Sequence, residues 1–212
     1  MAEVGRWPAI SDVYQNPFGA IIVRLRAGST RQPHSPKRRS VPVFGPVSTI
    51  EDSADNLKTL VLGIGNPLLG DDGVGFHVVQ ELLREVGDET PNLDIREASI
   101  GGLSLLDVIV GYDRVVLVDA VKTDCGEAGE VYKLRPEDFT STVHLTTSAH
   151  DTNLATALKI GNEFAREQMP KEIVIFAIEV EEVTKFTEDM TEKVRKAVPE
   201  VVNLVLQEIG LS

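Results

Sequence analysis

The sequence predicts an α/β fold of three layers, α/β/α, around a twisted and mostly parallel sheet that spans residues 57–212. Short apolar runs recur along this part of the chain, and they alternate with segments whose apolar residues follow helical spacing. The run DRVVLVDAV at 113–121 is apolar almost throughout, which is typical of a strand covered on both faces. Strands and helices that alternate in this way build βαβ units and a parallel sheet.

The first half of the domain holds two predicted strands and two predicted helices. TLVLGIG at 59–65 is a short apolar run that ends in glycines, so we expect a buried strand. Apolar residues at helical spacing predict a helix over 72–86. LDIREAS at 93–99 alternates as a strand does, and GGLSLLDVIVGY at 101–112 suits a short helix that begins after Gly102.

The segment 113–121 is expected to be the central strand, and it carries Asp119 near its carboxyl end. A further strand is predicted at 129–134 (GEVYKL), for which a position at the sheet edge is suitable.

Two helices and one strand complete the predicted domain. The helix at 149–169 has an Asp or Thr suited to capping and is closed by Pro170. EIVIFAIEV at 172–180 is the last core strand. The amphipathic segment 187–210 contains Pro199, which predicts a kinked helix or a helix in two pieces.

Residues 1–56 differ in composition from the rest of the chain. They hold six of the eleven prolines, and residues 1–50 carry a net charge of +5 against −17 for residues 51–212. We therefore predict a separate, Pro-rich and basic N-terminal extension that is loosely ordered and has no catalytic role. Within it, GAIIVRLRAG at 19–28 could form a short strand.

Composition excludes several classes of function. The net charge of −12 argues against general nucleic-acid binding. No apolar run approaches the length of a membrane span, and the N-terminus lacks a signal-peptide pattern. The single cysteine, Cys125, excludes an intrachain disulfide and a Cys-rich zinc site, which fits a reducing cytoplasm.

The turn after the first predicted strand, GIGNPLLGDDGVG, contains two adjacent acids, Asp71 and Asp72. A dinucleotide site would need a third glycine where Leu68 stands, and two carboxylates would repel a phosphate. We therefore expect no nucleotide. One acid can cap the following helix, and the other is left as a candidate site residue or a solvated first-turn acid.

Two further candidate residues come from other segments. Asp119 closes an apolar strand, where a carboxylate must be paired, hydrogen-bonded or solvated. His150 precedes a predicted helix, and small and hydroxyl residues at 146–149 leave room for a ligand beside it. In parallel sheets, sites form beyond the carboxyl ends of strands. Asp72, Asp119 and His150 could thus form a three-ligand metal site, or the two acids could form an acid/base pair.

The order and separation of three motifs, GIGNPLLGDDGVG, VVLVDAV and SAHDTNLATAL, resemble those of the NiFe-hydrogenase maturation endopeptidases. The similarity covers roughly residues 58–210, including the segment IEVEEVTKFTEDMTEKVRKAVP. The delta-subunit branch that accompanies the coenzyme F420-reducing hydrogenases of methanogenic archaea looks like the nearest relative. Residues 1–56 depart from the family, whose members begin near the first strand.

The resemblance implies an α/β/α fold and an endopeptidase, a hydrolase, which removes the C-terminal extension of a hydrogenase large-subunit precursor after nickel insertion. It implies that Asp72, Asp119 and His150 contact the nickel, which the substrate supplies. Asp71 is then the helix cap or a solvated acid. The turn carboxylate is Glu in some members and Asp here. We expect Gly63, Gly65, Gly70 and Gly73 of the turn to let the backbone bend tightly and approach a protein substrate.

Two mechanisms and two rival functions stay open at this point. In one mechanism the nickel aligns and polarises the scissile peptide, and in the other Asp72 and Asp119 activate water as an aspartyl-type pair. The rivals are a non-enzymatic nickel-binding accessory protein for hydrogenase assembly and, less favoured, a nucleotide-binding α/β protein. The sequence is silent on the oligomeric state.

Overall fold

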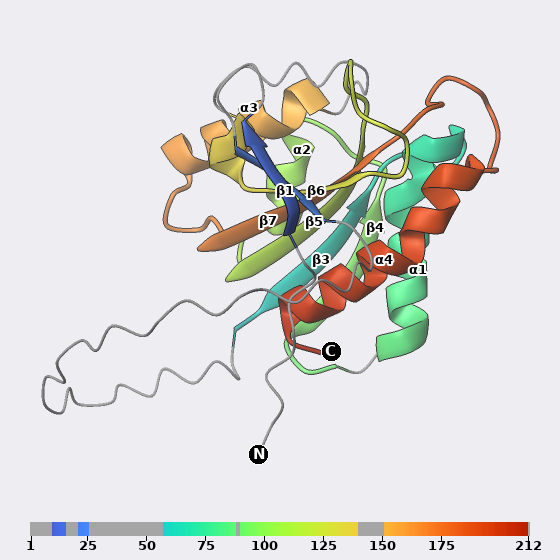
Figure 1. Cartoon of the computed structure of the whole chain (residues 1–212). Coiled ribbons are helices and arrows are strands. Elements are labelled where there is room, and N and C mark those ends of the chain that lie inside the picture. Colours follow the sequence, from blue (N-terminus) through green and yellow to red (C-terminus); the bar gives the residue numbers. More distant parts are fainter. Residues whose placement is uncertain (1–9, 16–20, 26–56, 88–89, 140–150, 212) are drawn as a thin grey trace, which may run out of the picture.

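The computed structural model describes residues 10–15, 21–25, 57–87, 90–139 and 151–211 (Figure 1). Within them, the strands form one seven-stranded sheet in the order β1-β2-β6-β7-β5-β3-β4. The strands are β1 Ile10–Gln15, β2 Ile21–Leu25, β3 Thr59–Ile64, β4 Leu93–Ala98, β5 Arg114–Val121, β6 Val131–Leu134 and β7 Glu172–Glu179. The helices are α1 Val74–Val86, α2 Ser104–Ile109, α3 Asp151–Phe164 and α4 Glu192–Ile209, with 3₁₀ turns η2 Gly70–Gly73 and η3 Pro136–Phe139.

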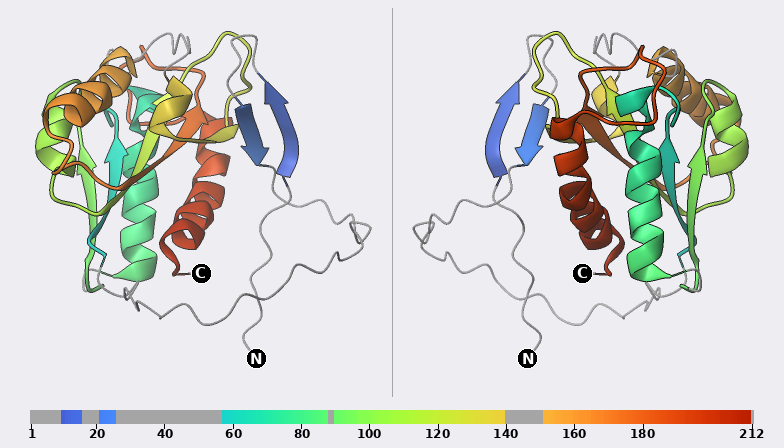
Figure 2. Two further views of the ribbon diagram at one scale, coloured as in Figure 1. Left: turned by 90° about the vertical axis from the view of Figure 1, so that its left-hand side faces the viewer. Right: turned by 90° about the vertical axis from the view of Figure 1, so that its right-hand side faces the viewer.

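The predicted three-layer α/β/α fold is confirmed. Strands β4, β3, β5 and β7 are parallel neighbours, and helices cover both faces of the sheet (Figure 2). Alternate residues of the central strands feed two separate cores. Val116 and Val118 of β5 belong to the core under α1 and α4, whereas Val115 and Leu117 belong to the core under α2 and α3.

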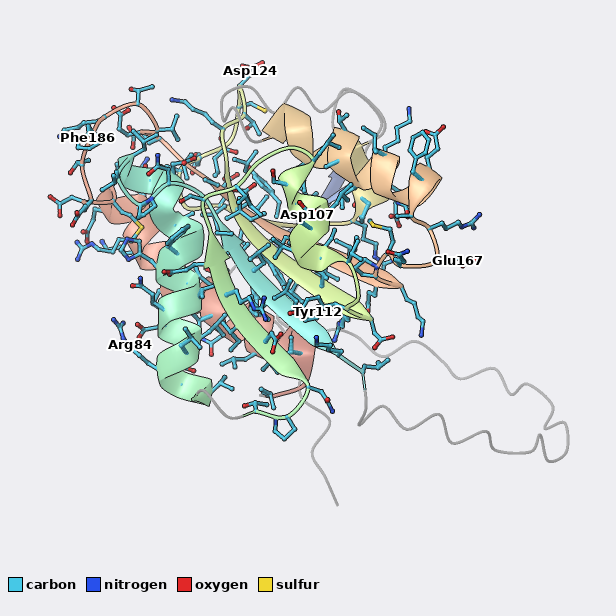
Figure 3. All side chains as sticks on the ribbon, turned by 180° about the vertical axis from the view of Figure 1, so that it is seen from behind. Arg84, Asp107, Tyr112, Asp124, Glu167 and Phe186 are labelled. Atoms are coloured by element: carbon cyan, nitrogen blue, oxygen red, sulfur yellow. The ribbon has the colours of Figure 1, made fainter. Side chains whose placement is uncertain are left out.

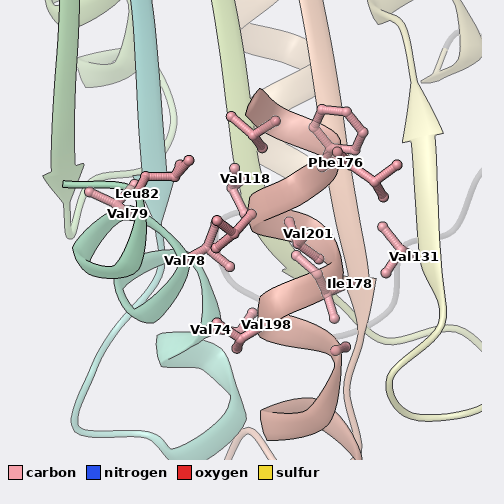
Figure 4. Close-up of a cluster of buried hydrophobic side chains, with 14 of the residues drawn as sticks. Val74, Val78, Val79, Leu82, Val118, Val131, Phe176, Ile178, Val198 and Val201 are labelled. Atoms are coloured by element: carbon pink, nitrogen blue, oxygen red, sulfur yellow. The ribbon is translucent and has the colours of Figure 1, made fainter. Parts of the chain in front are cut away.

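The core under α1 and α4 is built largely from valine. In Figure 4, Val78 of α1 and Val201 of α4 lie close to Val118 of the sheet, and Val74 of α1 and Phe176 of β7 belong to the same cluster. All five side chains are buried, so α1 and α4 pack against the same face of the sheet. None of the helices in the described part of the chain combines the length and apolarity needed to cross a bilayer.

Strand β6 runs antiparallel to β7, and the antiparallel strands β2 and β1 follow it outward. The connection from β5 to β6 spans only residues 122–130 and contains no helix, so it is too short for a parallel crossover. The expected edge position of the 129–134 strand is wrong, because β2 pairs with β6 on its outer side.

Strand β2 confirms the short strand that the sequence allowed within 19–28, and β1 is a further strand in the predicted N-terminal extension. The rest of residues 1–56 lies outside the described residues. The domain boundary at residue 57 stays a prediction.

The last helix, α4, is continuous through Pro199 and begins at Glu192, five residues later than predicted. Thr191 is its N-cap, and the backbone N–H of Thr191 is bound by the Asp71 carboxylate instead of entering a helix. Of the two alternatives that Pro199 predicted, the helix in two pieces is wrong, and the kink stays a prediction. The later start of α4 is explained by the hydrogen bond from the Thr191 N–H to Asp71 in the η2 turn.

The strand order creates one topological switch point. From β3 the chain continues by way of α1 to β4, whereas from β5 it continues in the opposite direction along the sheet, across β7 to β6. The carboxyl ends of β3 and β5 are direct neighbours, with Gly63 opposite Val118. A crevice opens in parallel sheets where neighbouring strands send their connections in opposite directions.

The start of α1 lies unusually close to this sheet edge. A Cβ atom on Gly75 would lie 2.4 Å from the carbonyl oxygen of Ile64 and 2.6 Å from that of Val118. Glycine at this position is therefore a packing requirement that links α1 to both β3 and β5.

We predict that Gly75→Ala lowers the free energy of unfolding by about 1–3 kcal/mol, because the added methyl group must displace backbone. Gln80→Ala, at an exposed site of the same helix, is the control variant. Urea denaturation followed by circular dichroism measures both. The packing argument would be contradicted if the Gly75→Ala protein were as stable as the parent. It would also be contradicted if the variant were more stable, as the higher helix propensity of Ala alone would make it.

Candidate functional site

Among the described residues, the four buried polar or charged side chains are all acids: Asp71, Asp72, Asp119 and Glu179. All four lie at or beyond the carboxyl ends of β3, β5 and β7. Buried carboxylates require hydrogen-bond donors or a cation close by. Their concentration at this edge identifies it as the candidate functional site.

Asp72 lies in the η2 turn and is 2% exposed. Its Oδ2 accepts a hydrogen bond of 2.8 Å from the backbone N–H of Asn66, in the turn between β3 and η2. Asn66 also closes the turn, because its Oδ1 accepts from the N–H of Leu68 and its carbonyl accepts from the N–H of Leu69. The Asp72 carboxylate is thus held in a fixed place just beyond β3.

Gly65 allows this turn to fold back on itself. Its φ is +144°, and an added Cβ would lie 1.9 Å from the carbonyl oxygen of Asp72. The backbone of Gly65 is also bound from β4's end, where the Ser99 hydroxyl donates to its carbonyl at 2.9 Å. The expectation that glycine lets this turn bend tightly is confirmed at Gly65, because the Asp72 backbone fills the space that a side chain would need. The approach of the turn to a protein substrate stays a prediction.

Asp119 lies on β5, one residue beyond the pairing of Gly63 with Val118. It is 5% exposed, and its Oδ1 accepts from the N–H of Ala120 at 2.9 Å. The alternation along β5 directs Asp119 to the face that α2 and α3 cover. There it lines a small hollow together with Ile64, Gly101, Gly102, Leu105 and Leu154, among others.

The third predicted residue, His150, lies outside the described residues. Its neighbour in sequence, α3, is described from Asp151, and Leu154 of that helix lines the same hollow as Asp119. No group of three His, Cys, Asp or Glu side chains arranged for a metal occurs within the described ranges. The site assignment of Asp72, Asp119 and His150 therefore stays a prediction.

Asp71 is neither the α1 cap nor a solvated acid, so that expectation is wrong. It is completely buried, and α1 begins after Gly73 without any side-chain cap. The Asp71 Oδ2 accepts from the N–H groups of Glu181 and Glu182, and its Oδ1 accepts from the N–H of Thr191 at 2.6 Å. The hydroxyl of Thr191 donates to Oδ2 as well. Asp71 therefore binds the segment between β7 and α4 to the η2 turn.

Among the described residues, Glu179 is the one buried acid at this edge of the sheet that the sequence analysis did not single out. It ends β7 and is 1% exposed, and the Thr123 N–H and hydroxyl donate to its carboxylate at 2.6 and 3.0 Å. A Cβ on Gly126 would lie 2.3 Å from the same carboxylate. Burial raises the pKa of the Glu179 carboxyl, and the Thr123 donors partly oppose this. An acid closing the apolar run EIVIFAIEV was the available signal, since the same pattern singled out Asp119.

A family model described as hydrogenase maturation protease matches residues 76–208 of this chain. A Methanocaldococcus jannaschii protein assigned by name to the hydrogenase maturation proteases is 30% identical over 155 residues, which are 71% of this chain and 95% of that protein. The hydrogenase 2 maturation protease of Escherichia coli is 29% identical over 115 residues, 52% of this chain and 69% of its own length.

Solved structures share the fold. The hydrogenase maturating endopeptidase HybD from Escherichia coli aligns with a TM-score of 0.61 at 24% identity, over 72% of this chain and 92% of its own. A hydrogenase maturation protease from Thermococcus kodakarensis aligns with a TM-score of 0.56 at 24% identity, over 74% and 95% of the two chains.

We predict that Asp71→Asn lowers the free energy of unfolding by about 2–4 kcal/mol, because it removes the charge that four donors share and turns an amide N–H₂ toward them. Asp107→Asn, at an exposed position of α2, is the control variant. Urea denaturation gives the energies, and amide hydrogen exchange should show faster exchange at 181–191. Unchanged exchange in that segment would refute the anchoring role.

A second prediction concerns Glu179 and pH. Its folded-state pKa is raised above the ordinary value of 4.5, so the folded protein holds this proton more tightly than the unfolded chain does. The stabilising contribution is complete below about pH 4.5 and is lost as pH rises through the raised pKa. Relative to Glu179→Gln, the parent protein should therefore become less stable as pH increases across this window.

Urea denaturation of both proteins at a series of pH values from 4 to about 8 measures this difference. Glu97→Gln, on an exposed position of β4, is the control for removing one carboxylate. A stability difference between parent and Glu179→Gln that is constant with pH would rule out an effect of burial on this carboxyl.

Proposed function

The chain belongs to the hydrogenase maturation protease family, and on this premise we propose that it removes the C-terminal extension of a NiFe-hydrogenase large-subunit precursor after nickel insertion. The observation that carries the site assignment is the switch point between β3 and β5. Of two buried carboxylates there, Asp72 lies beyond the carboxyl end of β3 and Asp119 lies near the carboxyl end of the adjacent parallel strand β5. The assignment of the chain to the delta-subunit branch stays a prediction.

In this proposal, Asp72, Asp119 and His150 contact the nickel that the precursor carries. Carboxylate and imidazole are suitable ligands for Ni²⁺, and the metal is part of the substrate, not a resident cofactor. Two facts support the set. The Asn66 N–H fixes the Asp72 carboxylate, and Leu154, four residues after His150, borders the hollow that Asp119 lines. An acidic pair also attracts the metal-loaded form of the precursor over the empty form.

Two routes to hydrolysis fit these residues. In the first, the nickel held by the three side chains polarises the scissile carbonyl or a water molecule. In the second, one carboxylate of the Asp72–Asp119 pair takes a proton from a water molecule while the oxygen of that water attacks the carbonyl carbon. The other, protonated, gives a proton to the departing nitrogen. In the second route the nickel only positions the peptide.

We place this reaction in the cytoplasm, where the single cysteine of the chain would stay reduced and a newly made precursor is accessible. The partner is then the large-subunit precursor, and no nucleotide takes part. In the turn that a nucleotide would need, the backbone carbonyl of Asp72 occupies the space beside Gly65.

The decisive experiment incubates the purified protein with nickel-loaded precursor and follows the intact mass of the precursor. We expect loss of the C-terminal peptide with the parent protein. Asp72→Asn, Asp119→Asn and His150→Ala should each reduce the rate by about 10²-fold or more, the scale expected for removing an acid/base or metal-contacting group. Asp107→Asn is the matched control, and urea denaturation checks that each variant is folded under the assay conditions.

A precursor that binds the protein but keeps its full mass would favour the non-enzymatic nickel-binding accessory protein. Full activity in any of the three variants would remove that residue from the site. Saturable binding of NAD or ATP in a titration would instead support the nucleotide-binding alternative.

A further inference from the structure

Two large apolar side chains are exposed next to the candidate site. Phe186, between β7 and α4, is 77% exposed, and Leu68, in the turn that carries Asp72, is 41% exposed. Their backbones run side by side, because the N–H of Thr187 donates to the carbonyl of Leu68 and Thr187 forms a parallel bridge with Leu69. Figure 3 shows Phe186 projecting from the edge of the molecule, away from the core.

The segment 181–191 is bound by the Asp71 carboxylate and is here named the Asp71 loop. Hydrogen bonds fix its backbone, although it contains no helix or strand. Besides the donors to the Asp71 carboxylate, the N–H of Asp71 donates to the carbonyl of Glu182, and the N–H of Gly70 donates to that of Thr187 at 2.7 Å. Inside the loop, the Glu182 Oε1 accepts from the N–H and hydroxyl of Thr184 and from the N–H of Lys185.

These bonds lie on both sides of Phe186, so the exposure of its ring does not result from a loose connection. A fixed backbone loses little conformational entropy when a partner binds, which makes an exposed aromatic residue on it an effective anchor. Aromatic residues that enter a pocket on the partner are typical of the few contacts that dominate protein–protein affinity.

The charge around Phe186 indicates what kind of surface would receive it. Glu181, Glu188 and Asp189 of the Asp71 loop are exposed acids, and Lys185 is the one basic residue between positions 181 and 191. A complementary surface would combine an apolar hollow for the ring with basic residues around it.

We propose that the Asp71 loop is a docking element for the hydrogenase large-subunit precursor, with Phe186 as the anchor and Leu68 beside it. The ring of Phe186 would enter an apolar hollow with a basic rim on the folded precursor, outside the C-terminal tail of that precursor. The inference rests on the proposed function and adds a second contact to it. The nickel would bind at Asp72, while Phe186, attached to the same turn, fixes the orientation of the precursor.

Phe164 provides a matched control, since it is 80% exposed and is the last residue of α3. It is followed by the segment that contains Glu167, which Figure 3 shows on the opposite side of the molecule from Phe186. Phe186→Ala and Phe164→Ala remove the same exposed ring from two different surfaces.

Both variants are assayed by calorimetric binding to nickel-loaded precursor and by the rate of cleavage at several precursor concentrations. For Phe186→Ala we expect Kd and KM to rise about tenfold or more, with kcat within about twofold of the parent. Phe164→Ala should match the parent in both. Urea denaturation checks that each variant is as stable as the parent protein.

The charged rim has its own test. Replacing Glu188 by Gln and Asp189 by Asn together should weaken the dependence of KM on salt concentration, because fewer ion pairs are then screened. The counterpart change Asp107→Asn should leave the salt dependence unaltered.

Equal Kd and KM for the Phe186→Ala and Phe164→Ala proteins would overturn the docking proposal and leave the protease function standing. A dimer that dissociates in Phe186→Ala while Kd and KM stay parental would also overturn it, since the ring would then contact a second copy. If the parent protein cuts no precursor, the protease function fails. The calorimetric comparison still decides whether Phe186 docks the precursor.

Discussion

The Asp71 carboxylate is the interaction on which the geometry of the candidate site depends. A fully buried charge is tolerable here because three backbone N–H groups and one hydroxyl converge on it. Those donors come from positions more than one hundred residues away in the chain. One side chain therefore holds together the end of β7, the start of α4 and the turn that presents Asp72.

Glu179 serves a similar purpose on the other side of the switch point. It binds Thr123 in the β5–β6 connection, just as Asp71 binds the β7–α4 connection. Asp119 lies on β5 between these two anchored regions. The four buried acids thus fall into two groups according to their hydrogen-bond donors. The carboxylates of Asp71 and Glu179 accept hydrogen bonds from main-chain and hydroxyl groups of neighbouring loops. Asp72 and Asp119 accept bonds from nearby backbone at the very ends of the strands.

The sequence was sufficient for the elements whose signal is local. The apolar runs of β3, β5 and β7 and the helical spacing of α1 lie within single segments, so periodicity located these elements to within a few residues. The partner of Asp71 could not be found in this way. Whether an acid caps its own helix or binds a distant loop depends on tertiary contacts, and both choices have the same local pattern, Asp-Asp-Gly. The start of α4 was misplaced for the same reason.

The proposed docking element adds a second point of recognition to the proposed nickel contact. Three ligands on a nickel ion carry little information about which protein holds that ion, because any exposed nickel centre offers similar coordination. A protease that cuts a folded precursor must also reject other chains, and contacts that depend on shape and charge supply that discrimination. Leu68 and Asp72 lie in the same connection between β3 and α1, and Asp71 binds the segment that contains Phe186 to it. The proposed nickel contact and the proposed protein contact are therefore mechanically connected, and docking at Phe186 would fix the position of the Asp72 carboxylate.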